Sequence, residues 1–422
     1  MVKIYLKQAW NMLKENPLIS GLSIIGTALA IAAVMMIILV VQVRTAEYAP
    51  ESARGRMLHV TAARVSVNES NTNNGYMGKR VVRELFYNLK TPQEVSGYAS
   101  NTVSVSSLAK RTFSKYKATY TDERFWNIFD FTFLDGAPFT YEESESGIRK
   151  AVISEKLAYR LFEGTEKACG QRLLVNRTEY TVCGVVKNVP RTAHFAYSDV
   201  WMPYNSSSRM ETDSNMAEGL VGGFCVVILA RNIGDFSAIR AEVKKLTKQF
   251  NATTAEYKVS FFYGPMSNLD LVVAAYNGFS MEIPYSKWFL SQGAFILFLL
   301  LLPALNMAGI TLTSFRKRRA EIGVRKAFGA TASRVFSQVI NENLVITFIG
   351  GILGLMLSIC LLLLTREIFF PAGTEFNISM LLRPVTFLSV VFFVFLLNLL
   401  CAGIPAWRAG KYNIVKSLNN QE

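Results

Sequence analysis

The segment from Ser314 to Thr331 has the most distinctive spacing of charged side chains in the chain. Its basic residues surround Glu321 and two aliphatic side chains, Ile322 and Val324. Charges of both signs beside a small apolar face suit the binding of another protein, whereas the basic residues alone would suit lipid headgroups. The residues by themselves leave both interpretations open.

The sequence has none of the spacings that common catalytic sites require. It lacks the P-loop pattern G-x-x-x-x-G-K-[ST], and it lacks G-x-S-x-G, H-E-x-x-H and the Rossmann glycine pattern. The two histidines, His59 and His194, lie far apart and have no cysteine spacing typical of zinc. We therefore predict a non-enzymatic subunit with no catalytic residue, no bound cofactor and no metal site.

Four apolar runs are long enough to cross a bilayer, which takes about 20 residues. They cover residues 18–43, 288–314, 335–364 and 385–405, and Glu342 is the one charged residue within them. With 51% hydrophobic and 18% charged residues, the composition is that of a membrane protein and excludes a disordered or secreted chain. The first run exceeds the core of a signal peptide, about 7–15 residues, so we expect a retained anchor.

Lysine and arginine are sorted by these runs. They are concentrated in residues 1–17, 315–334 and 406–422, and the positive-inside rule places those segments in the cytoplasm. Both termini are then inside, and residues 44–287 form one large outer domain. Residues 365–384 form a short outer loop. The net charge of +14 thus reports topology, and we expect no nucleic-acid partner.

Residues 2–15 have apolar side chains at helical spacing, with lysines on the other side. This pattern predicts an amphipathic helix in the inner membrane interface. The predicted fold class is a membrane α-helical protein, with four transmembrane helices arranged as one plus three. It carries a mixed α/β extracytoplasmic domain of two subdomains, the second inserted in the first.

Local patterns in the outer domain predict its strands and helices. Strands are expected at Leu58–Val67, Lys115–Tyr120, Tyr180–Val186, Val221–Ala230 and Tyr257–Tyr263. Helices are expected at Arg124–Phe129, Ser154–Phe162 and Ser237–Phe250, and a polar turn at Asn71–Gly75. The run Thr121–Glu123 is expected to cap the first of these helices.

Five cysteines are present, and Cys360 and Cys401 lie in the apolar runs. Cys169, Cys183 and Cys225 lie in the outer domain. Cys183 occupies an apolar position of a strand-like run, which favours a buried thiol, and a Cys169–Cys183 disulfide is the alternative.

The segment Ser314–Thr331 resembles the cytoplasmic loop of FtsX/MacB-type ABC permeases, whose pattern is R-x-x-E-I-G-[VI]-x-[KR]-A-x-G-A. The residues that carry the resemblance are Arg318, Glu321, Ile322, Gly323, Val324, Arg325, Lys326, Ala327, Gly329 and Ala330. Two outer runs, Arg124–Gly136 and Val152–Val186, look like parts of a MacB-type periplasmic core domain.

The resemblance implies a mechanism. Such permeases dimerise on two cytoplasmic ATPase domains, which bind ATP and Mg²⁺, and the helix after the second span docks into the ATPase as a coupling helix. ATPase closure then moves the spans, and their stalks pass the motion to the periplasmic domains, a scheme called mechanotransmission. It implies that the residues just named couple this chain to an ATPase.

Because these 422 residues carry no ATPase motif, the sequence predicts that the ATPase is a separate polypeptide. We expect a permease subunit of a bacterial inner membrane, paired with a second copy or a sister permease and surrounded by lipid. It would export drugs, peptides, amphiphiles or lipoproteins from the periplasmic side, through an adaptor and outer-membrane channel. The alternatives are an FtsX-like regulator of a cell-wall hydrolase and a membrane-anchored receptor without an ATPase.

Overall fold

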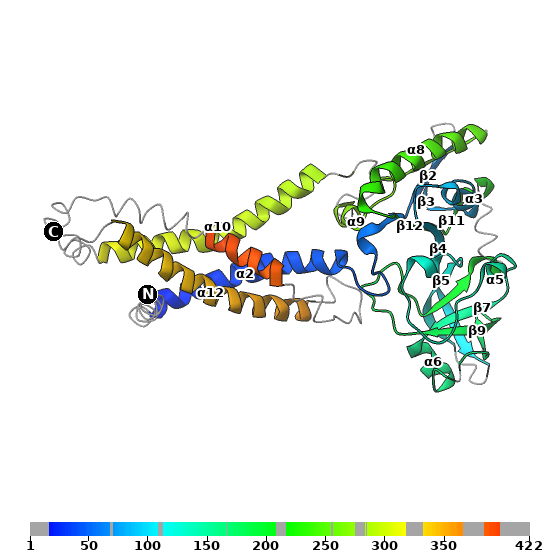
Figure 1. Cartoon of the computed structure of the whole chain (residues 1–422), viewed down its shortest axis with the longest axis horizontal. Helices are drawn as coiled ribbons and strands as arrows, with labels where there is room; N and C mark the ends of the chain where they lie inside the picture. Colours follow the sequence, from blue (N-terminus) through cyan, green and yellow to red (C-terminus); the bar gives the residue numbers. More distant parts are fainter. Residues whose placement is uncertain are drawn as a thin grey trace. The chain divides into compact units, whose positions relative to one another are not determined.

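The computed structural model describes residues 17–67, 71–108, 113–166, 168–207, 217–254, 256–274, 283, 285–317, 332–365 and 384–396. The chain divides into two compact units (Figure 1). One unit combines Met1–Val43 with Ser286–Glu422, and the other is Arg44–Tyr285. We call the second unit the outer domain.

The first unit is built from long apolar helices. They are α2 (Pro17–Thr45), α10 (Tyr285–Lys317), α12 (Ala332–Leu364) and a shorter helix at Pro384–Leu396. By length and composition, two described stretches are able to cross a membrane, Ser20–Thr45 and Val345–Leu364. Helix α10 covers the predicted second span, and the predicted fourth span is described only to residue 396. The number of four spans stays a prediction.

Three other predicted segments lie outside the described residues, apart from their end residues. They are the interfacial helix in 1–17, the outer loop 365–384 and the tail 406–422.

Small residues let α12 approach α2 closely. A Cβ built on Gly350 would lie 3.0 Å from the side chain of Thr27, and one built on Gly354 would lie 2.8 Å from the Ala28 carbonyl oxygen. Glycine at these positions allows two backbones to meet. Beside this contact, Ile31 and Leu39 of α2 pack with Leu362 in a shared apolar cluster.

The outer domain contains a large mixed sheet, which comprises nine strands within the described residues. Eight of them follow the order β1-β12-β4-β5-β10-β7-β9-β6, while β8 pairs with β4 and β9. Their bounds are β1 (Met57–Val60), β4 (Glu94–Ser107), β5 (Ser114–Thr121), β6 (Phe133–Gly136), β7 (Lys150–Ser154), β8 (Arg172–Val175), β9 (Thr178–Val186), β10 (Val200–Pro203) and β12 (Cys225–Leu229).

The second sheet has the order β11-β3-β2-β13. Its strands are β2 (Ala63–Val67), β3 (Asn71–Met77), β11 (Val221–Gly222) and β13 (Tyr257–Phe261). The predicted strands at Leu58–Val67 and Val221–Ala230 are confirmed as extended chain, but each is divided between the two sheets. Within the described residues the chain passes between the sheets five times, from β1 to β2, β3 to β4, β10 to β11, β11 to β12 and β12 to β13, so continuous backbone holds the two sheets together.

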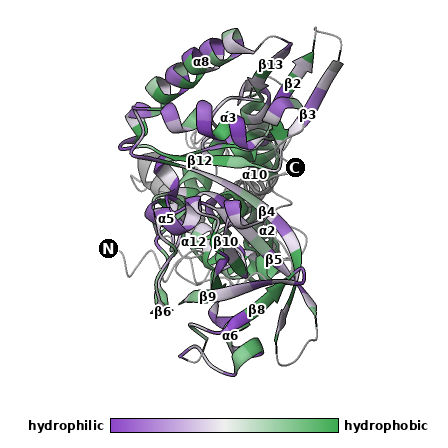
Figure 2. Cartoon of the chain, turned by 90° about the vertical axis from the view of Figure 1, so that its right-hand side faces the viewer, coloured by the Kyte–Doolittle hydropathy of each residue, from purple (hydrophilic) through white to green (hydrophobic). Residues whose placement is uncertain are grey.

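The prediction of a turn at Asn71–Gly75 was wrong, because these residues form most of β3. Figure 2 shows this strand in hydrophilic colour, in agreement with its sequence NTNNGYM. Strand β3 pairs antiparallel with β2 from Ala63↔Gly75 to Val67↔Asn71. The side chains of residues 72–74 are exposed and show no alternation of apolar and polar residues. Backbone hydrogen bonds to β2 therefore keep this segment extended.

The large sheet has a separate apolar core on each face, because successive side chains of a strand point to opposite sides. In β12, Val226 and Ile228 face one core, and Val227 and Leu229 face the other. The second core is rich in aromatic rings, including Phe125, Phe129 and Trp201.

Helices cover these cores. They are α3 (Lys79–Glu84), α4 (Phe125–Ile128), α5 (Tyr141–Glu145), α6 (Glu155–Phe162), α8 (Phe236–Thr253) and α9 (Asn268–Ala274). The predicted helices at 154–162 and 237–250 are confirmed as α6 and α8, and Ser154 caps α6 by accepting the Leu157 N–H. The predicted strands at 115–120, 180–186 and 257–263 are confirmed as β5, β9 and β13.

The expected cap at Thr121–Glu123 was wrong. Helix α4 has Arg124 as its N-terminal cap, and no side chain accepts a capping bond there. Asp122 is instead buried, where it accepts hydrogen bonds from Ser96 Oγ (2.5 Å) and the Tyr87 hydroxyl. Burial raises the pKa of Asp122 to about 7.

The cysteines of the outer domain are free thiols. Cys225 is buried, and Cys169 and Cys183 are half-buried. The Cys183 Sγ donates to the Ala151 carbonyl oxygen at 3.5 Å, and burial raises the pKa of this thiol to about 12. The interpretation as a thiol fits the structure, and the alternative Cys169–Cys183 disulfide is not formed in it.

Candidate functional site

The residues predicted to dock an ATPase lie outside the described part of the chain. They are Arg318, Glu321, Ile322, Gly323, Val324, Arg325, Lys326, Ala327, Gly329 and Ala330. The flanking helices are described, since α10 ends at Lys317 and α12 begins at Ala332. The site that the structure does describe lies at the other ends of α2 and α10, where the chain enters and leaves the outer domain.

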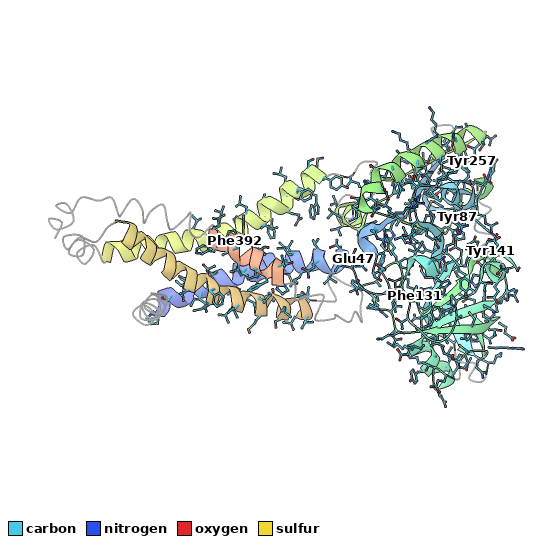
Figure 3. All side chains as sticks on the ribbon, in the orientation of Figure 1. Glu47, Tyr87, Phe131, Tyr141, Tyr257 and Phe392 are labelled. Carbon is cyan, nitrogen blue, oxygen red and sulfur yellow. The ribbon has the colours of Figure 1, made fainter. Side chains whose placement is uncertain are left out.

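The chain enters the outer domain through a buried ion pair. Figure 3 labels Glu47 just beyond the end of α2, and Glu51 and Arg54 follow it in sequence. Arg54 Nη2 lies 2.5 Å from Glu51 Oε2, and the two side chains are only 2% and 1% exposed. Two charges removed from water are tolerated only when further hydrogen bonds satisfy them, and both groups have such bonds.

Arg54 donates to three further groups. Its guanidinium lies 3.1 Å from the Arg44 carbonyl oxygen, 2.9 Å from the Thr192 carbonyl oxygen and 2.8 Å from the Tyr48 hydroxyl. The Arg44 carbonyl is among the last in α2, where a helix leaves its oxygens without intrahelical partners. Burial alone would lower the pKa of Arg54, but the charges and hydrogen bonds of Glu51 and Tyr48 together outweigh it, and the pKa is raised.

Glu51 connects the same point to a distant loop. Its Oε1 accepts the backbone N–H groups of Phe195 (2.9 Å) and Ala196 (3.0 Å). The pair therefore fastens the end of α2 to residues 192–196.

A second buried acid lies where the chain leaves the outer domain. Asp270 of α9 binds Arg240 of α8 at 2.7 Å, and it accepts a hydrogen bond from the hydroxyl of Tyr285, the first residue of α10. The Asp270 side chain is 4% exposed. Burial and the bond to Asp270 raise the pKa of Tyr285 to about 12.

The two points are bonded to each other. Asn268 Nδ2 donates to the Arg54 carbonyl oxygen at 2.7 Å, and His59 and Met266 exchange backbone hydrogen bonds of 2.7 and 2.8 Å. We call Glu51, Arg54, Asn268, Asp270 and Tyr285 the stalk-root cluster. Its side chains make a joint, because they bond to backbone groups and to one another.

The cluster is flanked by His59, a fully buried histidine. Its ring stacks on Phe195 with centroids 3.7 Å apart, and neither ring nitrogen has a hydrogen-bond partner within the described structure. Burial, with the positive charge of Arg54 next, lowers the pKa of His59 to about 3. The ring is therefore neutral at physiological pH and serves as apolar packing. Among the described residues, no group of three or more His, Cys, Asp or Glu side chains is placed to hold a metal ion.

The sequence predictions did not include this cluster. The one local signal was the acid and base at Glu51 and Arg54, three residues apart and directly after an apolar run. Nothing local indicated Asn268, which the fold brings to Arg54, or Asp270, which it brings to Arg240 and Tyr285.

Comparison with known proteins identifies both halves of the chain. A family described as the MacB-like periplasmic core domain matches residues 20–246, and one described as the FtsX-like permease C-terminal domain matches residues 293–414. The macrolide export ATP-binding/permease protein MacB of Escherichia coli K12 is 25% identical over 98% of this chain and 60% of its own length.

A second relative is an uncharacterised ABC transporter permease of Bacillus subtilis, YknZ, which is 24% identical over 60% of either protein. The crystal structure of the extracellular domain of a YknZ transporter from Gram-positive bacteria aligns with 48% of this chain and 99% of its own, at 15% identity and a TM-score of 0.35. The chain thus spans about 60% of the length of these curated relatives.

The first family match covers more than half of the 422 residues, and the second covers most of the remainder. The chain belongs to the ABC transporter permease family that joins a MacB-like periplasmic core domain to an FtsX-like permease domain.

Proposed function

We propose that this chain is the permease subunit of an ABC transporter in a bacterial inner membrane. A separate cytoplasmic ATPase would bind ATP and Mg²⁺ and dock on residues 318–330. A second copy of the chain, or a sister permease, would complete a dimer. Both termini would be cytoplasmic, and the outer domain would lie in the periplasm.

The stalk-root cluster is the observation that supports this proposal most directly. Helix α2 ends on the Glu51–Arg54 pair, α10 begins at Tyr285 on Asp270, and Asn268 bonds the two sites together. Buried charge-assisted bonds are short and strong, so a movement of either helix end would reach the same block of the outer domain. A receptor that only holds a ligand has no need for such a joint.

In the favoured form, the periplasmic movement exports a drug, peptide, amphiphile or lipoprotein from the periplasmic side, with an adaptor and outer-membrane channel. In the alternative form, the same movement activates a cell-wall hydrolase and no solute is moved. The two forms share the joint and differ in the periplasmic companion.

The test is purification of the tagged chain from native membranes in mild detergent, followed by mass-spectrometric identification of bound proteins. We expect an ATPase that is lost from Glu321→Lys and Gly323→Asp and kept by Lys416→Glu, a charge reversal in the predicted cytoplasmic tail. An adaptor among the companions would favour export, and a hydrolase would favour regulation. Recovery of the chain without an ATPase, even after cross-linking, would reject the transporter and support the receptor.

A second measurement addresses transmission. In Arg54→Met the ATPase should still co-purify, because residue 54 lies in the outer domain, but a periplasmic companion should no longer change the ATPase rate. A companion effect equal to that of the unaltered chain would show that the joint does not carry the motion.

A further inference from the structure

A group of basic side chains lies beside the end of α2. We call Arg44, Lys117, Arg191, His194 and Tyr197 the basic patch. Arg44 is in the last turn of α2 and directly follows the uncharged run 18–43. At about 1.5 Å per residue that run is about 39 Å long, which exceeds a hydrocarbon layer of about 30 Å but not the full bilayer of about 40–45 Å. Arg44 therefore lies at the depth of the outer headgroups.

The rest of the patch is held near Arg44 by the incoming joint. A single guanidinium, that of Arg54, donates both to the Arg44 carbonyl oxygen (3.1 Å) and to the Thr192 carbonyl oxygen (2.9 Å). The loop 191–197 therefore starts close to the end of α2, because one guanidinium contacts both. His194 is exposed in this loop.

Two cations of the patch converge on one aromatic ring. Lys117 Nζ lies 5.3 Å and Arg191 Cζ lies 5.5 Å from the centroid of Tyr197. All three side chains are half-buried, so part of each remains open to solvent. Tyrosine with neighbouring lysine and arginine is the side-chain combination that membrane interfaces favour.

The acids in this region are already engaged. Glu51 binds Arg54 and two backbone N–H groups, and Asp199 Oδ2 accepts the backbone N–H of Lys117 at 3.0 Å. Glu47, the next acid along the chain from Arg44, accepts the N–H of Gly55 at 3.1 Å. These carboxylates accept backbone N–H groups, and Glu51 and Asp199 also act on the charge of Lys117. The four cations Arg44, Arg54, Lys117 and Arg191 outnumber these three acids, so the region carries a net positive charge.

We propose that the basic patch binds the phosphate of an anionic phospholipid in the outer leaflet of the membrane that α2 enters. Arginine and lysine are the usual partners of phosphate oxygens, and a headgroup at the depth of Arg44 meets Arg191 and Lys117 without rearrangement of the helix end. The bound lipid would hold the outer domain close to the membrane surface. This goes beyond the proposed function and does not depend on it.

The test uses the full chain in nanodiscs that contain a graded fraction of phosphatidylglycerol in phosphatidylcholine. Hydrogen–deuterium exchange of residues 191–199 reports binding locally, so that lipid bound by the cytoplasmic lysines does not contribute. The variant is Lys117→Gln with Arg191→Gln. The control is Lys244→Gln with Lys245→Gln, which removes the same charge from two exposed residues of α8.

We expect phosphatidylglycerol to slow exchange of 191–199 in the unaltered chain and in the control. In the variant, the lipid fraction for half-maximal protection should rise roughly fivefold for each cation removed. Unchanged exchange of β10 in the variant would show that its fold is intact.

Three outcomes would overturn the proposal. They are equal protection in pure phosphatidylcholine, equal protection of the variant, and full protection by inorganic phosphate without anionic lipid, which would indicate a site for the free ion. Protection by an acidic peptide but not by phosphatidylglycerol would also reject the lipid, and it would make the patch a protein-docking surface.

Discussion

Replacement of Arg54 by methionine should destabilise the outer domain more than any loss of a surface ion pair. The change removes one partner of a pair whose side chains are 2% and 1% exposed, and it leaves the Glu51 carboxylate buried with only two backbone donors. It also leaves the carbonyl oxygens of Arg44 and Thr192 without the guanidinium.

The expected magnitude follows from the burial. Breaking a buried ion pair by removal of one partner destabilises a protein by about 3–5 kcal/mol. For a unit the size of Arg44–Tyr285, each kcal/mol shifts the melting temperature by about 2–4 °C, so the midpoint should fall by about 6–20 °C. A second change, Glu51→Gln, removes the stranded charge but keeps an oxygen for the two N–H groups. The double variant should therefore recover part of the loss.

The assay is thermal unfolding of the full chain in nanodiscs, followed by tryptophan fluorescence, since Trp201 is buried in the outer domain. The matched control is Arg172→Met, which breaks a pair with Glu179 whose side chains are 64% and 45% exposed. An exposed pair contributes about 0–1 kcal/mol, so this midpoint should hardly move.

Two results would refute the reasoning. One is a midpoint for Arg54→Met equal to that of Arg172→Met, which would mean that the buried charge is solvated in the protein. The other is a double variant that loses the sum of the two single losses, which would mean that Glu51 and Arg54 act independently.

Three further changes test other parts of the structure. The pKa of Asp122 is 3.8 when the side chain is free and about 7 when it is buried in the folded protein. The melting midpoint should therefore fall as pH rises from about 4 to 7, and Asp122→Asn should abolish this fall. His59 should make stability depend on pH in the opposite direction, because burial lowers its pKa from 6.5 to about 3. Its contribution to stability is complete above pH 6.5 and declines as pH falls toward 3. Acid sensitivity that persists in His59→Phe would contradict this assignment. Gly354→Ala places a Cβ 2.8 Å from the Ala28 carbonyl oxygen and should destabilise the membrane unit by about 1–3 kcal/mol, whereas Gly293→Ala, with nothing within 4 Å, should leave its denaturation in detergent unchanged.

Local sequence patterns predicted well where one segment alone decides the structure. Helix α8 follows its 3.6-residue apolar period, with Ile239, Val243 and Phe250 buried, and α6 forms where the amphipathic pattern of residues 154–162 predicted a helix. Local patterns failed where pairing with another strand determines the conformation. Strand β3 has no apolar alternation, and it is extended because β2 pairs with its backbone.

The same distinction applies to the site. Sequence alone predicted an ATPase-docking site at residues 318–330, because a charged motif is local and recognisable there, and this site stays a prediction. The stalk-root cluster left no such motif, since its members are bonded across long stretches of chain: Arg54 to Thr192 is 138 residues, and Asn268 to Arg54 is 214.

The sequence by itself indicated a membrane protein with a large outer domain, because the length of an apolar run and the sorting of lysine and arginine are local quantities. The charged motif at residues 318–330 carried the resemblance to the permease family. The tertiary structure decided which strands share a sheet, and that Arg44, Arg54 and Tyr285 belong to one hydrogen-bonded block of the outer domain. Sheet pairing and burial of charge both need hydrogen-bond partners that lie far away in the sequence. Only the folded chain brings Glu51, Asn268 and Asp270 to their partners.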